Sequence, residues 1–166
     1  MTKITSYKVG DKIIEFDQIF QISKIEYQKN GDGEKEPVMF FKTYFEEGIL
    51  NPVVCSIPIK NLSLTDIRKP ISKKELKIIL NKLNSGRILI KFINVDQIKD
   101  MLKTRNLYDV VNVIKILSKE EKDNPEKFNR NKKVLFESAV KILAQEYALV
   151  NRTEMKNARE KIMKLV

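Results

Sequence analysis

Lysine and arginine are the side chains of this sequence most able to do chemistry, and that chemistry is electrostatic binding. The 166 residues include 32 Lys and Arg against 22 Asp and Glu, so the formal net charge is +10. Residues 1–70 hold ten basic and ten acidic residues, whereas residues 71–166 hold 22 and 12. A general bias toward lysine in the composition would give both parts the same excess of basic residues. The asymmetry therefore indicates a polyanion-binding part joined to a neutral part with other work.

The residues that enzymes and metal sites most often use are scarce. The sequence has no histidine and one cysteine, Cys55, so a zinc site or a Cys–His nucleophile has nothing to be built from. The adjacent carboxylates of residues 46–47 and 120–121 diverge on a strand or helix, which favours solvation over acid–base catalysis. No glycine spacing matches a phosphate-binding loop. We therefore predict a protein that is not an enzyme and that has no cofactor and no metal.

Composition also bears on location. No apolar run approaches the ~18 residues that a membrane span needs, and residues 1–6 contain no apolar signal-like core. A single cysteine excludes an internal disulfide and fits a reducing compartment. We expect a cytoplasmic protein that is associated with the nucleoid and does not bind a membrane.

Residues 1–70 have the pattern of short strands separated by turns. Four of the five glycines and four of the five prolines lie there, and the Asn-Gly and Asp-Gly pairs of residues 29–33 favour a tight hairpin turn. This spacing predicts a small antiparallel sheet or barrel. The expected strands are residues 12–16, 19–27, 37–45 and 53–59, with a fifth short strand near 62–67.

After Pro70 the apolar period changes to that of helices. Ser72 and Glu75 form a capping box before the first helix, Asn94 and Asn106 are expected N-caps, and residues 151–154 resemble a second box before a last helix. The sequence thus predicts about five helices and a domain boundary near residue 70. The residues expected on inner faces are Leu76, Ile79, Leu80, Leu83, Val95, Ile98, Met101, Leu102, Leu107, Val110, Val111, Ile114, Leu117, Val134, Leu135, Ser138, Ala139, Ile142, Leu143, Tyr147, Met155, Ala158 and Ile162.

Three stretches resemble the CarD/CdnL family of bacterial transcription regulators. They are Lys-Val-Gly-Asp at 8–11, residues 57–72 with Ile-Pro-Ile-Lys-Asn and Ile-Arg-Lys-Pro-Ile-Ser, and the helical residues 131–149. The resemblance implies an α+β protein, with an N-terminal Tudor/SH3-like antiparallel β barrel followed by a C-terminal bundle of about five helices. It also implies that residues 1–70 interact with RNA polymerase and that the basic residues 71–166 bind DNA.

For the barrel, the resemblance implies docking on the RNA polymerase β subunit through an exposed strand and its edge. The matching positions in this sequence are Tyr27, Gln28, Val54 and Ser56. Members of the family often have arginines at such positions, where this chain has Gln28 and Ser56. Because edge addition uses backbone groups more than particular side chains, the docking mode can survive that difference.

For the helical part, the resemblance implies contact with double-stranded promoter DNA near the upstream edge of the transcription bubble, which stabilises the open complex. The family's tryptophan wedge is absent, and Phe92 at that position would serve as the wedge or belong to the core. No set of side chains suggests a base-reading code, so phosphate and shape contacts are expected. The candidate DNA-binding residues are Arg87, Lys91, Phe92, Lys99, Lys103, Arg105 and Lys132.

Two other functions fit the same charge pattern. One is a general nucleoid- or RNA-binding protein without polymerase contact, against which the neutral balance of residues 1–70 argues. The other is an adaptor whose basic part meets an acidic protein. Steep salt dependence of duplex binding would favour DNA over an acidic partner.

Overall fold

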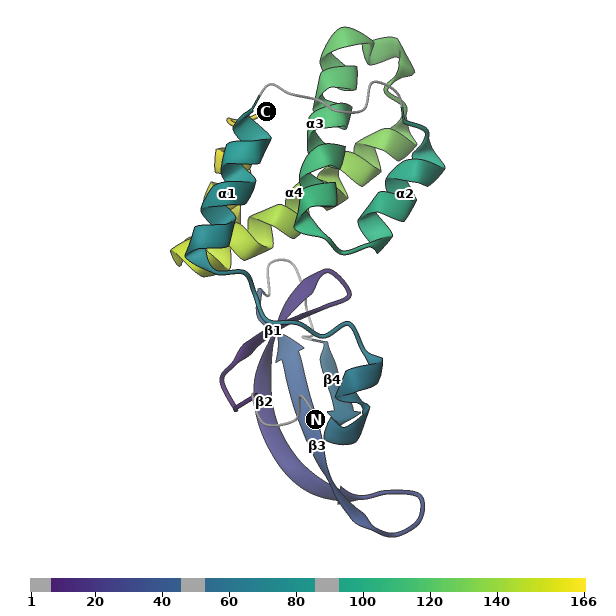
Figure 1. Cartoon of the computed structure of the whole chain (residues 1–166), viewed down its shortest axis with the longest axis vertical. Helices are drawn as coiled ribbons and strands as arrows, with labels where there is room; N and C mark the ends of the chain where they lie inside the picture. The colour runs from purple at the N-terminus through teal and green to yellow at the C-terminus, as the bar shows by residue number, and fades with distance from the viewer. Residues whose placement is uncertain (1–6, 46–52, 86–92) are drawn as a thin grey trace. The chain divides into compact units, whose positions relative to one another are not determined.

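The computed structural model describes residues 7–45, 53–85 and 93–166, and it forms two compact units (Figure 1). One unit is Met1–Pro70 and the other is Ile71–Val166. The first contains the strands and the second contains the α-helices. We describe each unit by itself.

The first unit is built on a four-stranded antiparallel sheet. Its strands β1 (Lys12–Glu15), β2 (Gln18–Lys29), β3 (Lys35–Thr43) and β4 (Val54–Pro58) follow one another in space as they do in sequence. Each strand pairs with the next, so short turns are sufficient to connect β1 to β2 and β2 to β3. This order leaves one long side of β4 outside the sheet's pairing.

The turn between β2 and β3 is held by the side chain of Asn30. Its Oδ1 accepts hydrogen bonds from the backbone N–H groups of Asp32, at 3.0 Å, and Glu34, at 2.9 Å. Gly33 has φ +83°, a conformation that glycine adopts at little cost. The predicted hairpin turn at residues 29–33 is confirmed.

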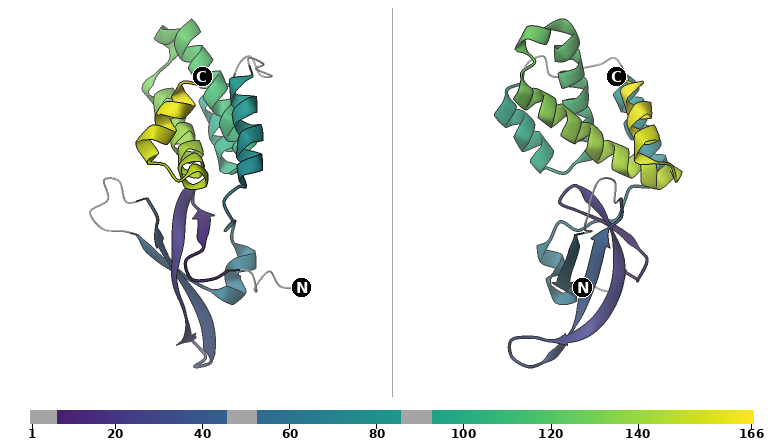
Figure 2. Two further views of the ribbon diagram at one scale, coloured as in Figure 1. Left: turned by 90° about the vertical axis from the view of Figure 1, so that its left-hand side faces the viewer. Right: turned by 180° about the vertical axis from the view of Figure 1, so that it is seen from behind.

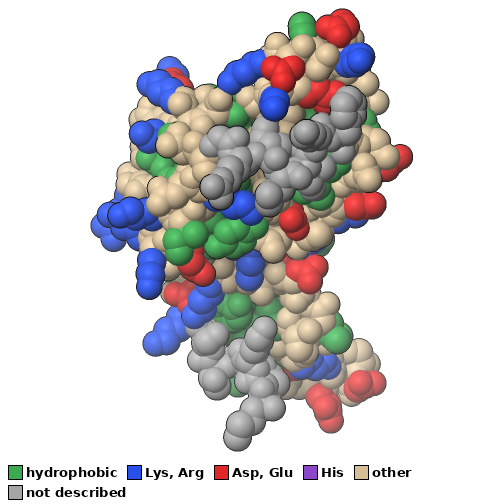
Figure 3. All heavy atoms as spheres, turned by 45° about the horizontal axis from the view of Figure 1, so that its top comes forward, with side chains coloured by type: hydrophobic (Ala, Val, Ile, Leu, Met, Phe, Trp, Pro, Cys, Tyr) green, Lys and Arg blue, Asp and Glu red, His purple; other side chains and the backbone are tan. Residues whose placement is uncertain are grey.

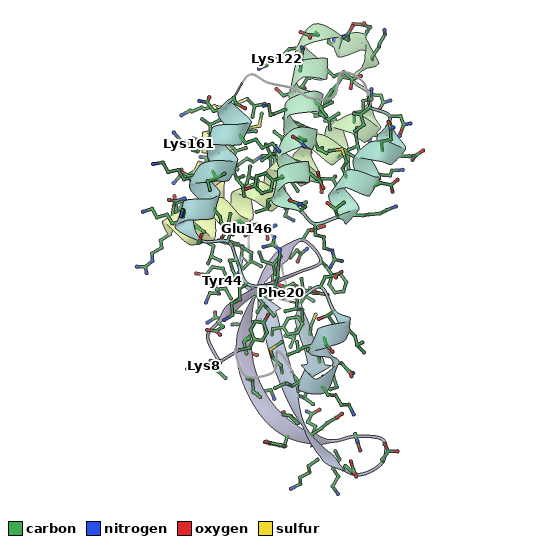
Figure 4. All side chains as sticks on the ribbon, in the orientation of Figure 1. Lys8, Phe20, Tyr44, Lys122, Glu146 and Lys161 are labelled. Carbon is green, nitrogen blue, oxygen red and sulfur yellow. The ribbon has the colours of Figure 1, made fainter. Side chains whose placement is uncertain are left out.

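The sheet curves around a small apolar core. Phe20 and Phe41 lie at its centre, where their rings meet edge to face with centroids 5.2 Å apart (Figure 4). Burying a large apolar side chain contributes about 1.5–3 kcal/mol, so this core accounts for much of the unit's stability. The buried residues of the core are Ile13, Phe20, Ile22, Met39, Phe41 and Leu62.

The fifth strand predicted near residues 62–67 is wrong. Residues Ile59–Leu64 form the 3-10 helix η2, which places Ile59 and Leu62 against the core at a spacing of three. The chain then returns to β1 at a single bridge, where the backbones of Ile14 and Arg68 exchange hydrogen bonds of 2.8 and 3.2 Å. The spacing of these apolar residues suits a 3-10 turn better than the alternation of a strand.

The second unit contains five α-helices. Helix α3 packs against α1, α2 and α4, and α4 packs against each of the other helices (Figure 2). A four-stranded antiparallel sheet followed by five helices confirms the predicted α+β class. The helices are α1 (Lys73–Asn84), α2 (Val95–Lys103), α3 (Leu107–Asp123), α4 (Arg130–Asn151) and α5 (Met155–Met163), with the 3-10 helix η3 (Pro125–Lys127) before α4.

The predicted starts of the first three helices are confirmed. Ser72 and Glu75 form the capping box of α1, with bonds of 3.2 Å from Glu75 N to Ser72 Oγ and 2.8 Å from Ser72 N to Glu75 Oε2. Asn94 caps α2, and Asn106 accepts a bond of 2.9 Å from Tyr108 N at the start of α3. The box predicted at residues 151–154 is wrong. Asn151 ends α4 and donates to the Tyr147 carbonyl, and no side chain caps α5.

Most residues predicted on inner faces are buried, but α4 is rotated relative to the prediction in its first turns. Val134 is 58% exposed and Ser138 is exposed, whereas Phe136 is buried. The ring of Phe136 meets that of Phe128, which follows η3, with centroids 6.4 Å apart. This contact determines which face of α4 turns inward there. Among the described residues, none of the helices is both long and apolar enough to cross a lipid bilayer.

A buried carboxylate fixes the first residue of the helical unit. Glu146 of α4 is 2% exposed, and its Oε2 accepts a hydrogen bond of 3.0 Å from the backbone N of Ile71 (Figure 4). Ile71 lies two residues before α1, so the bond joins the start of α1 to the middle of the long helix. Without it, a partly buried backbone donor and the buried carboxylate of Glu146 would lose this contact.

We predict that Glu146→Ala lowers the free energy of unfolding by about 1–3 kcal/mol, because the partly buried N–H of Ile71 loses a charged acceptor. Glu137→Ala on the same helix is the matched control, because Glu137 is exposed. Urea unfolding followed by circular dichroism measures both. Equal effects of the two substitutions would contradict the role of Glu146.

Candidate protein and nucleic-acid interfaces

Strand β4 presents two of the four residues predicted to dock polymerase. Val54 is 63% exposed and Ser56 is exposed, while the alternating residues Cys55 and Ile57 pack against the core. Cys55 is half-buried. We call the side of the sheet that carries Val54 and Ser56 the outer face.

The strand register shows which candidates share this outer face. Ser56 lies opposite Phe40, and Phe40 lies opposite Lys24. Gln28 alternates with Lys24 on the same face but pairs near the far end of β3, about 20 Å along the strand from Val54. Tyr27 points to the opposite face and is 71% exposed. The structure thus groups three of the four candidates on one face and separates Tyr27 from them.

A polar network on β2 belongs to the outer face and was not predicted. Lys24 Nζ lies 2.9 Å from Glu26 Oε1 and 4.4 Å from the ring centroid of Phe40. Gln28 Nε2 donates to the same oxygen of Glu26 at 3.2 Å. The hydrogen bond from Lys24 lowers the pKa of Glu26. These charges compensate each other, and their alternating positions on β2 are the sequence signal that could have revealed the network.

In the helical unit, three of the candidates lie outside the described residues. They are Arg87, Lys91 and Phe92. The assignment of Arg87 and Lys91 to DNA stays a prediction, and the two interpretations of Phe92 as a wedge or a core residue both stay open.

The predicted lysines of α2 do not form an unopposed positive patch. Lys99 Nζ lies 3.4 Å from Asp96 Oδ1, and Lys103 Nζ lies 2.8 Å from Asp100 Oδ1. The hydrogen bond to Asp100 raises the pKa of Lys103. All four side chains are exposed, so the pairs are weak, but together they make the surface of α2 electrically neutral. Arg105 follows α2 in the left-handed conformation, with φ 54°.

Lys132 has a partner inside the fold. Its ammonium group forms an ion pair with Glu120, and the two side chains are only 14% and 18% exposed, so the pair links α4 to α3. Lys132 also lines an open pocket at the start of α2 with Ile93, Asn94, Val95 and Gln97. The structure therefore brings Lys132 close to that end of α2, but it directs the charge to a neighbouring carboxylate.

Residues 95–163 match the family model described as CarD, C-terminal domain. The chain carries a CarD C-terminal domain. This match confirms the resemblance to the CarD/CdnL family of transcription regulators, a family of non-enzymatic proteins that interact with the transcription machinery. No curated protein matches the chain.

The CarD C-terminal domain defined by this match comprises α2 to α5, and α1 precedes it. Within the part of the chain that the structure describes, no group of three or more cysteine, aspartate or glutamate side chains is arranged to hold a metal ion.

A buried lysine joins this domain to α1. Lys115 of α3 is 8% exposed, and its Nζ donates to the carbonyl of Lys82 at 3.1 Å, to Ser85 Oγ at 3.2 Å and to the carbonyl of Ser85. A cation at the C-terminal end of a helix is stabilised by the helix dipole. Burial, and then the nearby charge of Lys82, hold the pKa of Lys115 below its usual value of 10.5. The helical period gives no sign of this contact, because lysine is normally exposed.

We predict that Lys115→Ala lowers the free energy of unfolding by about 1–3 kcal/mol, because the carbonyls at the end of α1 lose a charged donor. Lys119→Ala, an exposed lysine one turn further along α3, is the matched control and should change it by less than about 0.5 kcal/mol. Thermal unfolding at neutral pH compares the two. A loss no larger than that of the control would contradict the capping role.

The same lysine predicts a dependence of stability on pH. Because the pKa of Lys115 is lowered on folding, the unfolded chain binds more protons than the folded chain just below pH 10.5. The contribution of Lys115 to the free energy of unfolding should therefore increase as pH rises through that window. Urea unfolding of the wild type relative to Lys115→Met, between pH 8 and 10.5, measures this difference. A difference that falls with pH would contradict the sign.

Proposed function

We propose that this protein is a non-enzymatic regulator of transcription initiation. Its sheet unit binds the RNA polymerase β subunit, and its basic helical unit binds promoter DNA near the upstream edge of the bubble and stabilises the open complex. The observation that carries this proposal is the match of residues 95–163 to the CarD C-terminal domain. The sheet unit that precedes the match supplies a second, neutral module for a protein partner.

The edge of β4 supports the polymerase half of the proposal. In the described sheet β4 pairs only with β3, so backbone groups on its other side are available for an added strand. Val54 and Ser56 project from the exposed face beside that edge. An added strand gains affinity from main-chain hydrogen bonds, and neighbouring side chains supply selectivity. The main-chain hydrogen bonds do not require the arginines that other family members have at these positions.

The charge of residues 71–166 supports the DNA half. Twenty-two basic residues against twelve acidic ones attract a polyanion, and binding to phosphates releases counterions whatever the base sequence. The helical unit therefore does not need to read bases. Its position at a promoter would come from the polymerase to which the sheet unit is bound.

Stabilising the open complex requires a difference in affinity. A ligand that binds the open and closed promoter equally shifts neither population. Tenfold tighter binding to the open form corresponds to about 1.4 kcal/mol, which is enough to change the ratio of the two forms tenfold. The effect on transcript yield depends on which step limits a given promoter.

We predict that Val54→Asp weakens polymerase binding by about tenfold or more, because a carboxylate would be desolvated beside the edge of β4. Co-purification of RNA polymerase with the tagged full-length chain measures this binding. Val9→Asp is the matched control: Val9 is 60% exposed, close to the 63% of Val54, and precedes β1. Equal loss in both variants would argue against docking at β4.

The same co-purification distinguishes the proposed function from that of a general nucleoid- or RNA-binding protein. A wild-type chain that retains nucleic acid but never co-purifies with polymerase would support that alternative. It would also overturn the tethering role of the sheet unit.

We further predict that the wild-type chain increases the open fraction at an unstable promoter, as reported by a fluorescent base analogue placed in the bubble. Val54→Asp should reduce this increase to near the level without protein, because the tether to polymerase is lost. An increase that is unchanged in Val54→Asp would show that DNA binding alone is sufficient.

A further inference from the structure

The cations of the helical unit are distributed unevenly among its helices. Helix α2 has two lysines and two aspartates, and α3 has three lysines and four acidic residues. In contrast, α1 has four lysines and one glutamate, and α5 has three basic residues and one glutamate. The positive excess therefore lies on α1, α4 and α5 rather than on α2 and α3.

Three of the four lysines of α1 are exposed and have no acidic partner among the described residues. Lys73, Lys74 and Lys77 are exposed and form no ion pair with any residue that the structure describes. The one carboxylate of this helix, on Glu75, is held at the N-cap, where it accepts bonds of 2.8 Å from both the N and the Oγ of Ser72. The first turn of a helix disfavours lysine, so these residues do not serve helix stability.

The same is true of α5. Lys156, Arg159 and Lys161 are exposed, and none forms an ion pair within the described residues. Lys156 and Arg159 lie three residues apart on α5, so they share one side of that helix. The contrast with Lys99 and Lys103 of α2 is therefore one of pairing and not of exposure.

Both helices face the same side of the helical unit. Each packs on α4, and the left view of Figure 2 shows α1 and α5 turned toward the viewer. In Figure 3, Lys and Arg side chains gather on the side of this unit that carries α1, whereas Asp and Glu are more frequent on the other side. Lys161 projects on that side in Figure 4. We call the exposed cations of α1 and α5 the α1–α5 face.

Most apolar residues of these helices face inward, and only Ile78 of α1 and Met163 of α5, which are 47% and 45% exposed, could enter a membrane. Leu76 and Ile79 of α1 are each 2% exposed, and Ala158 and Ile162 of α5 are fully buried. A helix that binds a lipid surface needs its apolar face free to enter the headgroup region. The α1–α5 face therefore fits a soluble polyanion better than an anionic membrane.

The spacing of the cations fits a phosphate backbone. Lys74 and Lys77 on α1, like Lys156 and Arg159 on α5, are separated by about 4.5 Å along the helix axis, and successive phosphates of one DNA strand by about 3.4 Å along the duplex axis, so each row can reach neighbouring phosphates. Two helices on one side of the unit provide two such rows. An acidic peptide would not need cations in two separate rows.

We propose that the α1–α5 face is a phosphate-binding surface for duplex DNA and that the surface of α2 is not. The inference rests on the DNA-binding half of the proposed function and goes beyond it by naming the contacts. None of these residues was among the sequence candidates, and α1 precedes the stretch that matches the family model.

The test compares three double substitutions in the full-length chain. They are Lys74→Gln with Lys77→Gln on α1, Lys156→Gln with Arg159→Gln on α5, and Lys99→Gln with Lys103→Gln on α2 as the matched control. Each removes two positive charges from exposed positions, so the loss of general attraction is the same. Differences among the three therefore report local phosphate contacts.

The measurement is the dissociation constant for a 30-base-pair duplex of arbitrary sequence, determined by fluorescence anisotropy over a range of salt concentrations. Each lost phosphate contact reduces the slope of log K against log salt by about 0.9. We expect the α1 and α5 variants each to lose about 1.8 of slope and the α2 variant to lose less than half of that. A larger loss for α2 than for α1 and α5 would overturn the inference.

Other outcomes separate this inference from the proposed function. A wild-type chain that binds no duplex DNA would overturn the DNA half of the function, and this inference with it. Duplex binding that only the α2 variant weakens would leave the function standing and overturn the α1–α5 face alone. The chain could also bind anionic phospholipid vesicles or polyglutamate more tightly than the duplex. If the α1 and α5 variants weakened that binding, the face would belong to another partner and the inference would be overturned.

Discussion

Helix α3 is buried along most of its length, and the arrangement of the helical unit depends on how its neighbours cover it. Val110, Val111, Val113, Ile114 and Leu117 are each at most 1% exposed, so apolar side chains leave α3 in several directions. Three helices must then pack around it, which α1, α2 and α4 do. An environment this crowded has no room for water, and every polar group inside it needs a partner from the protein.

That requirement explains which charges are committed to structure. Lys115 is satisfied by the carbonyls that end α1, Lys132 by Glu120, and Glu146 by the backbone N of Ile71. Each of these contacts joins two segments that α3 or α4 holds together, so the charges fix how the helices meet. On α1, Lys82 lies over the Tyr108 ring of α3, but the exposed cations of α1 and α5 make no such contact among the described residues. Charge in this unit therefore falls into two classes, one used within the fold and one left on the surface.

The sequence predicted the features that depend on local order. The Asn-Gly and Asp-Gly turn, the Ser72–Glu75 capping box and the apolar stripes of the helices are all written in neighbouring residues. Predictions from the sequence were wrong where contacts with distant residues determine the structure. Leu62 packs on the core from a 3-10 helix and not from a strand, and Phe136, which contacts Phe128, is buried in place of Val134. For the interfaces, the resemblance to the family indicated Val54 and Ser56, which are exposed, but only the register could show that Tyr27 lies on the other face.

The same distinction applies to the basic residues. A lysine in a sequence has a charge but no visible partner, so counting lysines located the positive excess in residues 71–166 without locating it within that part. The candidates taken from the family's DNA-facing region included Lys99, Lys103 and Lys132, and all three have carboxylate partners. Pairing with an acid reduces the potential that a lysine presents to a phosphate, because the partner must be displaced or remain nearby. In a strongly basic domain, then, the informative quantity is the number of exposed cations without acidic partners. Among the described residues α1 and α5 carry such cations, and so does α4 at Arg130, Lys133 and Lys141, whereas the lysines of α2 are paired.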